Sequence, residues 1–242
     1  MNLLVLMYHR ARAGRHGNAP SVLDAHFAHI ANCFHPVLPG DSISKGPTSV
    51  CLSFDDGYFD FYHTVFPLLV RHNLKALLAV PVNVVTDQTS VPVNARLAVE
   101  SEVAFSKPET GGFCTWSELE RMTASGRVRI AAHGNTHVRL DGPSVDTHRE
   151  IRLPQSVLEA RLGQPVDSFV FPYGRFSSDS LHVARRCYTH VFRIGGAINC
   201  SWGAPVLYRV DADEMKSPHA LFHPGRMLQY RARYLWNRLR HR

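Results

Sequence analysis

Short apolar runs alternate with helix-forming segments along most of this chain, and this alternation limits the folds that the chain can adopt. Strands that are separated by helices favour a parallel sheet or a barrel. The chain has 242 residues, of which 45% are hydrophobic and 19% charged, which suits one globular domain over residues 1–242. We expect the strands at 3–7, 50–54, 76–80, 128–132, 168–171, 191–194 and 206–210.

Two segments between these strands carry helix-start signals. Ser21–Asp24 and Thr115–Glu118 each resemble a capping arrangement, and Gly126 gives the second helix a stop signal. Residues 83–112 instead mix Thr, Ser, Asn, Pro and Gly without a sustained period, so we expect a long loop with no more than one short helix. Loops of this length in compact domains are more often functional than idle.

Cysteine spacing and the first residues of the chain bear on the cell compartment. The five cysteines are odd in number and show no C-x-x-C spacing, so we expect neither a disulfide framework nor a cysteine zinc site. Residues 1–7 are apolar but lack a basic leader and a small-residue cleavage site, and we interpret them as a core strand. No stretch reaches the roughly 20 apolar residues that span a bilayer. These features predict a cytoplasmic protein.

Much of the net charge of +7 comes from the end of the chain. Arginines alternate with apolar side chains over residues 226–242, which predicts a basic amphipathic helix. Two roles fit such a helix: docking on the core with a solvated basic face, or peripheral contact with an anionic surface such as the inner membrane face or a phosphorylated substrate. Nucleic acid is not expected, because no recognised binding motif accompanies the charge.

Two adjacent carboxylates follow the apolar strand at 50–54. Asp55 and Asp56 precede Gly57, and a bend guided by this glycine lets both carboxylates approach one pocket from different angles. Negative charge at the end of a buried strand is costly, so the pair indicates a bound cation. Asp-Gly is also an ordinary turn signal, and the tripeptide by itself leaves a plain turn open.

Two histidines follow the strand at 128–132. His133 and His137 are four residues apart with Gly134 between them, so both imidazoles can face one side of a helical turn or tight loop. With one of the two acids they form a set of two nitrogens and one carboxylate, which suits a catalytic zinc or similar ion with a position open for water. The other acid is then a base for water that attacks a carbonyl carbon. Spacing alone leaves open which aspartate has which role.

Three motifs, in their order along the chain, resemble those of the NodB-like polysaccharide deacetylases, carbohydrate esterase family 4. They are Ser53-Phe54-Asp55-Asp56-Gly57, His133-Gly134-Asn135-Thr136-His137 and Phe171-Pro172-Tyr173-Gly174. Residues 6–10 (LMYHR) also resemble the first strand of a branch associated with surface-polysaccharide biosynthesis. The resemblance runs from about Leu3 to about Val210 and implies a distorted (β/α)7 barrel of the NodB-homology type, with its metal at the carboxyl ends of the strands.

By this resemblance the reaction is removal of an N-acetyl group, or another small acyl group, from an amino sugar of lipopolysaccharide, O-antigen or capsule biosynthesis. The sugar is expected to be nucleotide-linked, lipid-linked or part of an oligosaccharide. The implied catalytic groups are the Asp55 carboxylate, as general base, and the Tyr173 backbone N–H, as oxyanion donor. One divalent ion, with zinc expected, is assigned to Asp56, His133 and His137. The residues expected to contact the substrate are His9, Pro172 and Arg209.

Two departures from the family's pattern leave roles open. An arginine that often lies two residues before the proline of the third motif is replaced by Val170, and Arg175 and Arg209 are the candidates to take its place. The late histidine that usually serves as general acid has no clean copy, and the candidates are His219, His223 and His9. These gaps favour one alternative, a non-catalytic carbohydrate-binding protein that retains the barrel. The retained Asp55 disfavours it, because a pure binding site has no need of an unligated acid.

Overall fold

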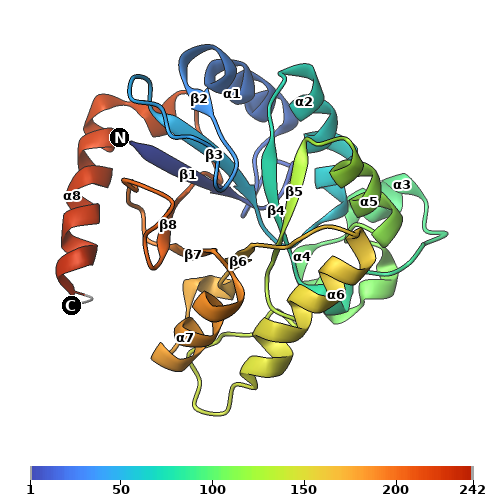
Figure 1. Ribbon diagram of the computed structural model, residues 1–242. Helices are drawn as coiled ribbons and strands as arrows, with labels where there is room; N and C mark the ends of the chain where they lie inside the picture. The colour runs from blue at the N-terminus through green and yellow to red at the C-terminus, as the bar shows by residue number, and fades with distance from the viewer. Residues whose placement is uncertain (1, 241–242) are drawn as a thin grey trace.

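The chain folds into a closed ring of parallel strands surrounded by helices (Figure 1). The computed structural model describes residues 2–240. The seven strands of the ring are β1 (Leu3–Tyr8), β3 (Ser49–Phe54), β4 (Ala76–Val80), β5 (Val128–Ala132), β6 (Ser168–Val170), β7 (His190–Ile194) and β8 (Leu207–Asp211). Each strand pairs with its neighbours in this order, and β8 pairs with β1 to close the ring.

The predicted barrel is confirmed, and each predicted strand begins and ends within one residue of the observed one. A short strand, β2 (His35–Pro36), pairs with the start of β3 outside the ring. The ring is weakest between β5 and β6, where the pairing joins only Ala132 and Phe169. The distortion expected of this barrel is therefore located at one strand pair.

Alternate residues of each strand face the barrel interior or the surrounding helices, as the period of two requires. In β1, Leu4 and Leu6 belong to the large apolar cluster that also contains Phe27 of α1 (Pro20–Cys33). Leu3 and Val5 belong to a second cluster, which fills the interior of the ring with side chains from the other strands. Both faces of the strands are buried, which explains why the strands are apolar runs rather than alternating patterns.

The helices outside the ring begin where local signals place them, with one correction. α1 begins at Pro20 with Ala19 in the N-cap position, so the capping arrangement predicted at Ser21 is wrong; proline at the first helical position provides the start signal instead. The capping box at Thr115 is confirmed at the start of α5 (Trp116–Ala124). The other helices that cover the ring are α2 (Phe66–Arg71), α6 (Leu153–Leu162) and α7 (Ser178–Cys187).

Residues 83–112 contain two short α-helices, α3 (Val93–Ala98) and α4 (Ser101–Ser106), where at most one was predicted. Arg96 holds this segment in place. Its guanidinium is buried, forms two hydrogen bonds of 2.7 and 2.9 Å to the Glu118 carboxylate, donates to two backbone carbonyls and lies 3.4 Å from the centroid of the Phe59 ring. Such a long-range ion pair leaves no periodic pattern in the sequence, which is why the segment was predicted to be a loop.

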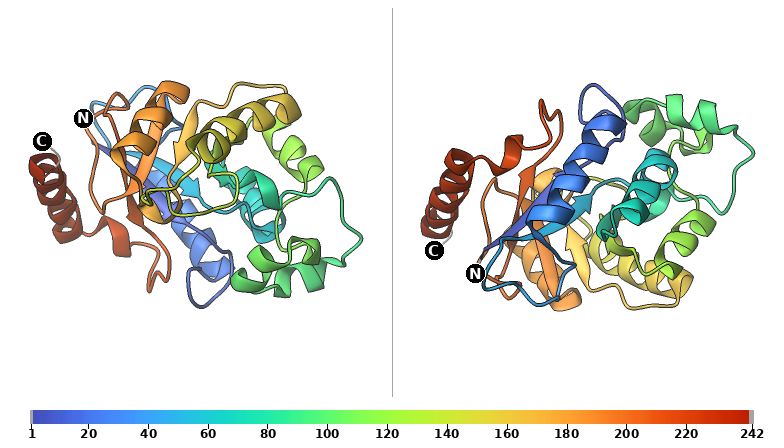
Figure 2. Two further views of the ribbon diagram at one scale, coloured as in Figure 1. Left: turned by 90° about the horizontal axis from the view of Figure 1, so that it is seen from below. Right: turned by 90° about the horizontal axis from the view of Figure 1, so that it is seen from above.

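The predicted basic helix at the end of the chain is present as α8 (Pro224–Arg240); residues 241 and 242 of the predicted range lie outside the described part of the chain. It lies along one side of the barrel, and α3 and α4 lie on the opposite side (Figures 1 and 2). Within residues 2–240, no helix is both long enough and apolar enough to cross a membrane.

Replacement of Arg96 by methionine is expected to lower the free energy of unfolding by about 3–5 kcal/mol, because it leaves the Glu118 carboxylate buried without its cation. The matched control is Arg161→Met. Arg161 also lies over an aromatic ring, but its ion pair with Asp87 is exposed. Its loss is expected to cost about 0–1 kcal/mol. Urea unfolding of both variants measures the difference. Equal losses would show that Arg96 does not hold the segment.

Candidate metal and catalytic site

Inward-facing positions of several strands meet at the carboxyl end of the barrel. Val5, Cys51 and Ala131 face the interior in β1, β3 and β5. Because side chains alternate along a strand, the residues two or four positions further along point to the same interior as the strands end. His9, Asp55 and His133 therefore point to the interior. Arg209 joins them because it lies two residues after Leu207, which faces inward in β8.

These side chains line a cavity of about 520 Å³, which is within the range of about 300–1,000 Å³ typical of small-molecule sites. One wall comes from α4 in the long segment 83–112, so the segment that was predicted to be functional lies at the cavity. The other lining residues are Met7, His16, Asp56, Tyr58, Ser101, Glu102, Phe105, His137, Tyr173, Ile194 and Asp211.

The bend that brings both aspartates to this cavity lies at Asp56. Asp55 still belongs to the strand ladder, because its N–H donates to the carbonyl of Tyr8 at 2.9 Å. Asp56 and Gly57 then have φ values of 71° and 69°, so the chain turns at once and the two neighbouring carboxylates converge. The left-handed conformation costs a non-glycine residue about 1–2 kcal/mol, so the surrounding structure holds this strain.

Asp56, His133 and His137 form the group of potential metal ligands in the described part of the chain. The Asp56 Oδ1 atom lies 3.4 Å from His133 Nε2 and 3.2 Å from His137 Nε2. Burial alone raises the pKa of Asp56, but its contacts with the two imidazoles hold the pKa well below the usual range. Oδ1 is buried and has no hydrogen-bond partner among the described residues, so these residues fit a divalent cation.

The orientation of the His133 ring is fixed by a hydrogen bond at Nδ1, the ring nitrogen that faces away from Asp56. Its Nδ1–H donates a hydrogen bond of 2.8 Å to the backbone carbonyl of Val170, in the neighbouring strand β6. The Nε2 lone pair is therefore available on the side of Asp56, which is the usual arrangement of a metal-binding histidine. Valine replaces the arginine expected at position 170, but the backbone carbonyl of Val170 orients the His133 imidazole.

Arg209, and not Arg175, is the arginine that orients the Asp55 carboxylate. Its guanidinium makes two hydrogen bonds to the Asp55 carboxylate, at 2.6 and 2.8 Å, and a third to Ser53 Oγ at 3.0 Å. Arg175 is exposed instead. Burial alone raises the pKa of Asp55, but Arg209 and His133 lower it overall, so the carboxylate is ionised. Arg209 lines the cavity, yet it is bound to Asp55, which favours a positioning role over the substrate contact predicted for it.

His9 is the one of the three candidate general acids that lines the cavity in the described structure. Its Nδ1–H donates to the Asp213 carboxylate at 2.6 Å, and its Nε2 lies 3.8 Å from Asp55 Oδ2. Burial alone would lower the pKa of His9, but the Asp213 hydrogen bond and the nearby carboxylates raise it to about 9. His219 and His223 are exposed and do not line the cavity.

The third motif forms one edge of the cavity. Tyr173 has a left-handed φ of 57° and is 57% exposed, and its ring lies beside the His137 ring with centroids 4.8 Å apart. Its backbone N–H donates to no acceptor within residues 2–240, as an oxyanion donor requires. Pro172 is buried and does not line the cavity, so its predicted contact with substrate stays a prediction.

Residues 42–192, more than half of the chain, match the family model described as polysaccharide deacetylase. The chain belongs to the polysaccharide deacetylase family. No curated protein matches the sequence. The family membership confirms the resemblance on which the NodB-type barrel was predicted, and the three motifs now lie around one cavity.

Solved structures of deacetylases share this fold at low sequence identity. The polysaccharide deacetylase BC0361 from Bacillus cereus is 19% identical, with a TM-score of 0.72, over 90% of this chain and 67% of its own. The de-N-acetylase from Aggregatibacter actinomycetemcomitans is 22% identical, with a TM-score of 0.70, over 89% and 97%. The deacetylase PplD from Streptococcus pyogenes is 19% identical, with a TM-score of 0.72, over 95% and 98%.

One residue of this deacetylase site carried no signal in the sequence. Glu150 is buried and accepts hydrogen bonds from the backbone N–H groups of Asn135 and Thr136, each at 3.0 Å, and from the Thr136 hydroxyl at 2.7 Å. It thereby fixes the short loop between His133 and His137. Gly134 in this loop has a φ of 76°, and a Cβ there would lie 3.4 Å from a Glu150 oxygen.

Replacement of Glu150 by glutamine is expected to weaken metal binding by about 10–100-fold, because one acceptor for the loop N–H groups becomes a donor and the histidines lose their fixed spacing. The matched control is Glu159→Gln. The Glu159 carboxylate does not line the cavity, and it accepts one hydrogen bond of 3.0 Å from a backbone N–H. Competition with a chelator measures the metal affinity of both variants, and thermal unfolding checks that both are folded. Equal affinities would remove Glu150 from the support of the site.

Proposed function

We propose that this member of the polysaccharide deacetylase family hydrolyses the N-acetyl group, or another small acyl group, of an amino sugar in lipopolysaccharide, O-antigen or capsule biosynthesis. The observation that carries the proposal is an ionised Asp55 that Arg209 fixes beside, but apart from, the set Asp56, His133 and His137. A site that only binds sugar has no need of such a base. Hydrolysis also agrees with the family.

The residues divide the chemistry between them. A divalent ion, which we propose to be zinc, held by Asp56, His133 and His137 supplies a Lewis acid and makes water more acidic. Asp55 accepts the proton of the attacking water as the oxygen bonds to the acyl carbon. Arg209 keeps the Asp55 carboxylate ionised and aimed at the cavity, since both of its oxygens are held by the guanidinium.

Two further groups complete the reaction. The Tyr173 N–H stabilises the negative charge that develops on the acyl oxygen, and its left-handed backbone keeps this donor free of other acceptors in the described structure. His9 is protonated at neutral pH and donates its proton to the nitrogen as the C–N bond breaks. The products are a free amine on the sugar and a carboxylate. Arg209 and His9 thus fill the two gaps that had favoured a non-catalytic binding protein.

The charges of the cavity bear on the form of the substrate. Asp55, Asp56, Glu102 and Asp211 line it, and the one arginine among the described lining residues is bound to Asp55. A phosphate inside the cavity would therefore meet these carboxylates, and the protonated His9 beside them is already paired with Asp213. We infer that the amino sugar itself enters, and that the phosphate of a nucleotide or lipid carrier remains outside.

We also infer that the protein acts in the cytoplasm. All five cysteines are free, and Cys33 and Cys200 are exposed thiols of the kind that a reducing compartment keeps unoxidised. Fractionation of cells, followed by immunodetection, tests this location. Recovery from the periplasm or the medium would contradict it.

The proposed activity is tested by incubation of the zinc-loaded protein with a panel of N-acetylated amino sugars, free, oligomeric and carrier-linked, and measurement of the amine released. The expected result is release from at least one class, with loss after chelation and recovery after zinc is restored. No release from any class by protein with confirmed bound metal would contradict the proposal.

Asp55→Asn is expected to lower kcat by about 10²–10⁴-fold, because an amide cannot accept the proton of water. Its metal affinity should stay within a few-fold of that of the unaltered protein, whereas Asp56→Asn should lose the metal. Turnover assays and metal titration of both variants separate base from ligand. Unchanged turnover in Asp55→Asn, or equal loss of metal in both, would remove the proposed division of roles.

The pH profile of kcat/KM tests His9. The raised pKa of about 9 keeps the imidazole protonated at neutral pH, so kcat/KM should fall as the pH rises towards 9. This fall is the alkaline limb of the profile. A bound cation opposes protonation of His9 and moves the limb to a somewhat lower pH. The groups that face His9 are Asp55, Asp56, His16, Asp211 and Asp213. Asp213→Asn should move the limb down towards the ordinary histidine value of about 6.5.

The control for this shift is Asp179→Asn, which makes the same charge change on the exposed surface of α7. It should leave the alkaline limb in place. A limb that Asp213→Asn does not move would show that His9 is not the group that titrates.

A further inference from the structure

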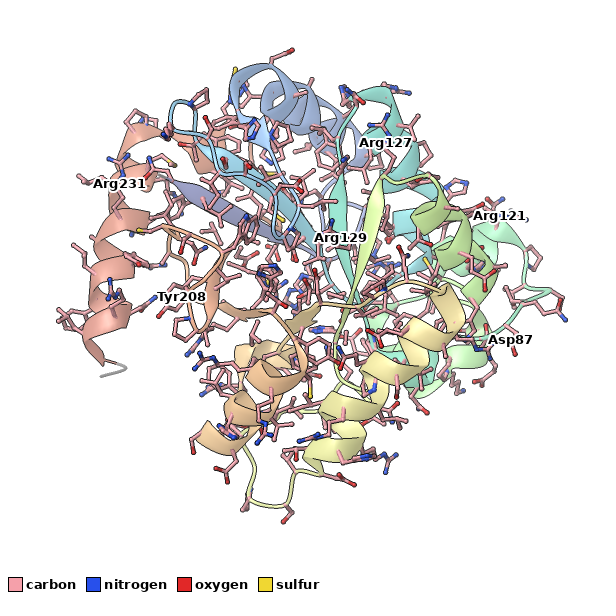
Figure 3. The ribbon with its side chains drawn as sticks, viewed as in Figure 1. Asp87, Arg121, Arg127, Arg129, Tyr208 and Arg231 are labelled. Carbon is pink, nitrogen blue, oxygen red and sulfur yellow. The ribbon has the colours of Figure 1, made fainter. Side chains whose placement is uncertain are left out.

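The helix α8 packs on the barrel through a narrow stripe of side chains. Tyr230 is 2% exposed, and its carbonyl accepts a hydrogen bond from Ile198 N–H. The Tyr234 ring lies 6.4 Å from that of Tyr208, which Figure 3 shows between the barrel and the helix, and Asn237 donates to a backbone carbonyl after β7. Together with the half-buried Met227, these positions are three or four residues apart and form one side of α8.

A second stripe on α8 is apolar and exposed. Leu228, Leu235 and Leu239 are 68%, 64% and 64% exposed, and Trp236 is 60% exposed. These are the four most exposed large apolar side chains among residues 2–240. At about 100° per residue, the three leucines lie within an arc of about 40°, about 140° around the helix from the docking stripe. Docking on the barrel therefore does not account for them.

Arginines border the three leucines on one side. By the same helical geometry, Arg231 and Arg238 lie about 60–80° around the helix from Leu228, between the leucines and the docking stripe, whereas Arg226 and Arg233 lie next to the other edge of the docking stripe. Figure 3 shows Arg231 at the outer edge of the molecule. The sequence of α8 contains no aspartate or glutamate, so no carboxylate on the helix offsets this charge.

We propose that α8 binds the surface of an anionic phospholipid bilayer, with Leu228, Leu235 and Leu239 inserted among the acyl chains and the arginines on the headgroup phosphates. A bilayer surface supplies an apolar layer bordered by negative charge, which matches this pattern. A second copy of the chain would instead bring two sets of arginines together without carboxylates to pair them. The proposal does not depend on the chemistry at Asp55, because none of these side chains lines the cavity.

The test is flotation of the full chain with vesicles of phosphatidylcholine alone and with vesicles that also contain phosphatidylglycerol. Binding is expected to the anionic vesicles, to weaken at high salt and to be weak to neutral vesicles. The variant Leu228→Ser/Leu235→Ser/Leu239→Ser should lose at least tenfold in binding, and Arg231→Gln/Arg238→Gln about fivefold for each arginine at low salt. All of these positions are exposed, so both variants should unfold at the temperature of the unaltered protein.

Matched controls make the same changes elsewhere on the surface. Val70→Ser/Val138→Ser removes exposed apolar side chains, and Arg185→Gln/Arg186→Gln removes two charges from α7; both should bind like the unaltered protein. Equal binding by the leucine variant, or equal loss in the controls, would overturn the proposal. So would failure of the unaltered protein to float, or lipid-free self-association that the leucine variant abolishes, which would assign the stripe to a second copy.

Discussion

Two consecutive aspartates are buried at the end of β3, and the residues around them compensate the negative charge of their carboxylates. Asp55 and Asp56 are 3% and 5% exposed, and uncompensated charge at such positions is costly. The structure compensates them differently. Asp55 is paired with the guanidinium of Arg209, whereas Asp56 faces two imidazoles and retains an oxygen without a hydrogen bond among the described residues. This difference is the basis for assigning one as base and the other as ligand.

Each group of the site is held by a partner from a different part of the ring. His133 is oriented by the carbonyl of Val170 in β6, and Asp55 by Arg209 in β8. His9, at the end of β1, is held by Asp213 just after β8. A closed parallel barrel places the carboxyl ends of all its strands at one rim, so partners far apart in sequence meet there. The fold is thus the means by which three separate contacts reach one cavity.

Patterns local in sequence predicted the strand bounds and a parallel sheet or barrel, and the resemblance of the three motifs to a known family implied the barrel. The strands are continuous apolar runs because they are buried on both faces, and such runs are visible without a structure. Arg209, rather than Arg175, reaches Asp55 because closure of the ring places β8 next to β1, and β1 pairs with β3 on its other side. Neither local pattern nor spacing carries that information.

Other features also escaped prediction for physical reasons. Glu150 belongs to a short π-helical segment (His148–Arg152), and only the folded chain shows its carboxylate on the histidine loop. The second short helix in 83–112 depends on the buried Arg96–Glu118 pair. The start of α1 differs from the prediction because Pro20, which suits the first helical position, begins the helix one residue before Ser21.

The most direct test of the division between Asp55 and Asp56 is a crystal structure of the zinc-loaded protein with anomalous scattering measured at the zinc edge. The account predicts one zinc peak within bonding distance of Asp56, His133 and His137, with Asp55 still held by Arg209 and outside the coordination sphere. A zinc ion bound by Asp55, or an ion held elsewhere while Asp56 forms no bond to it, would contradict the account.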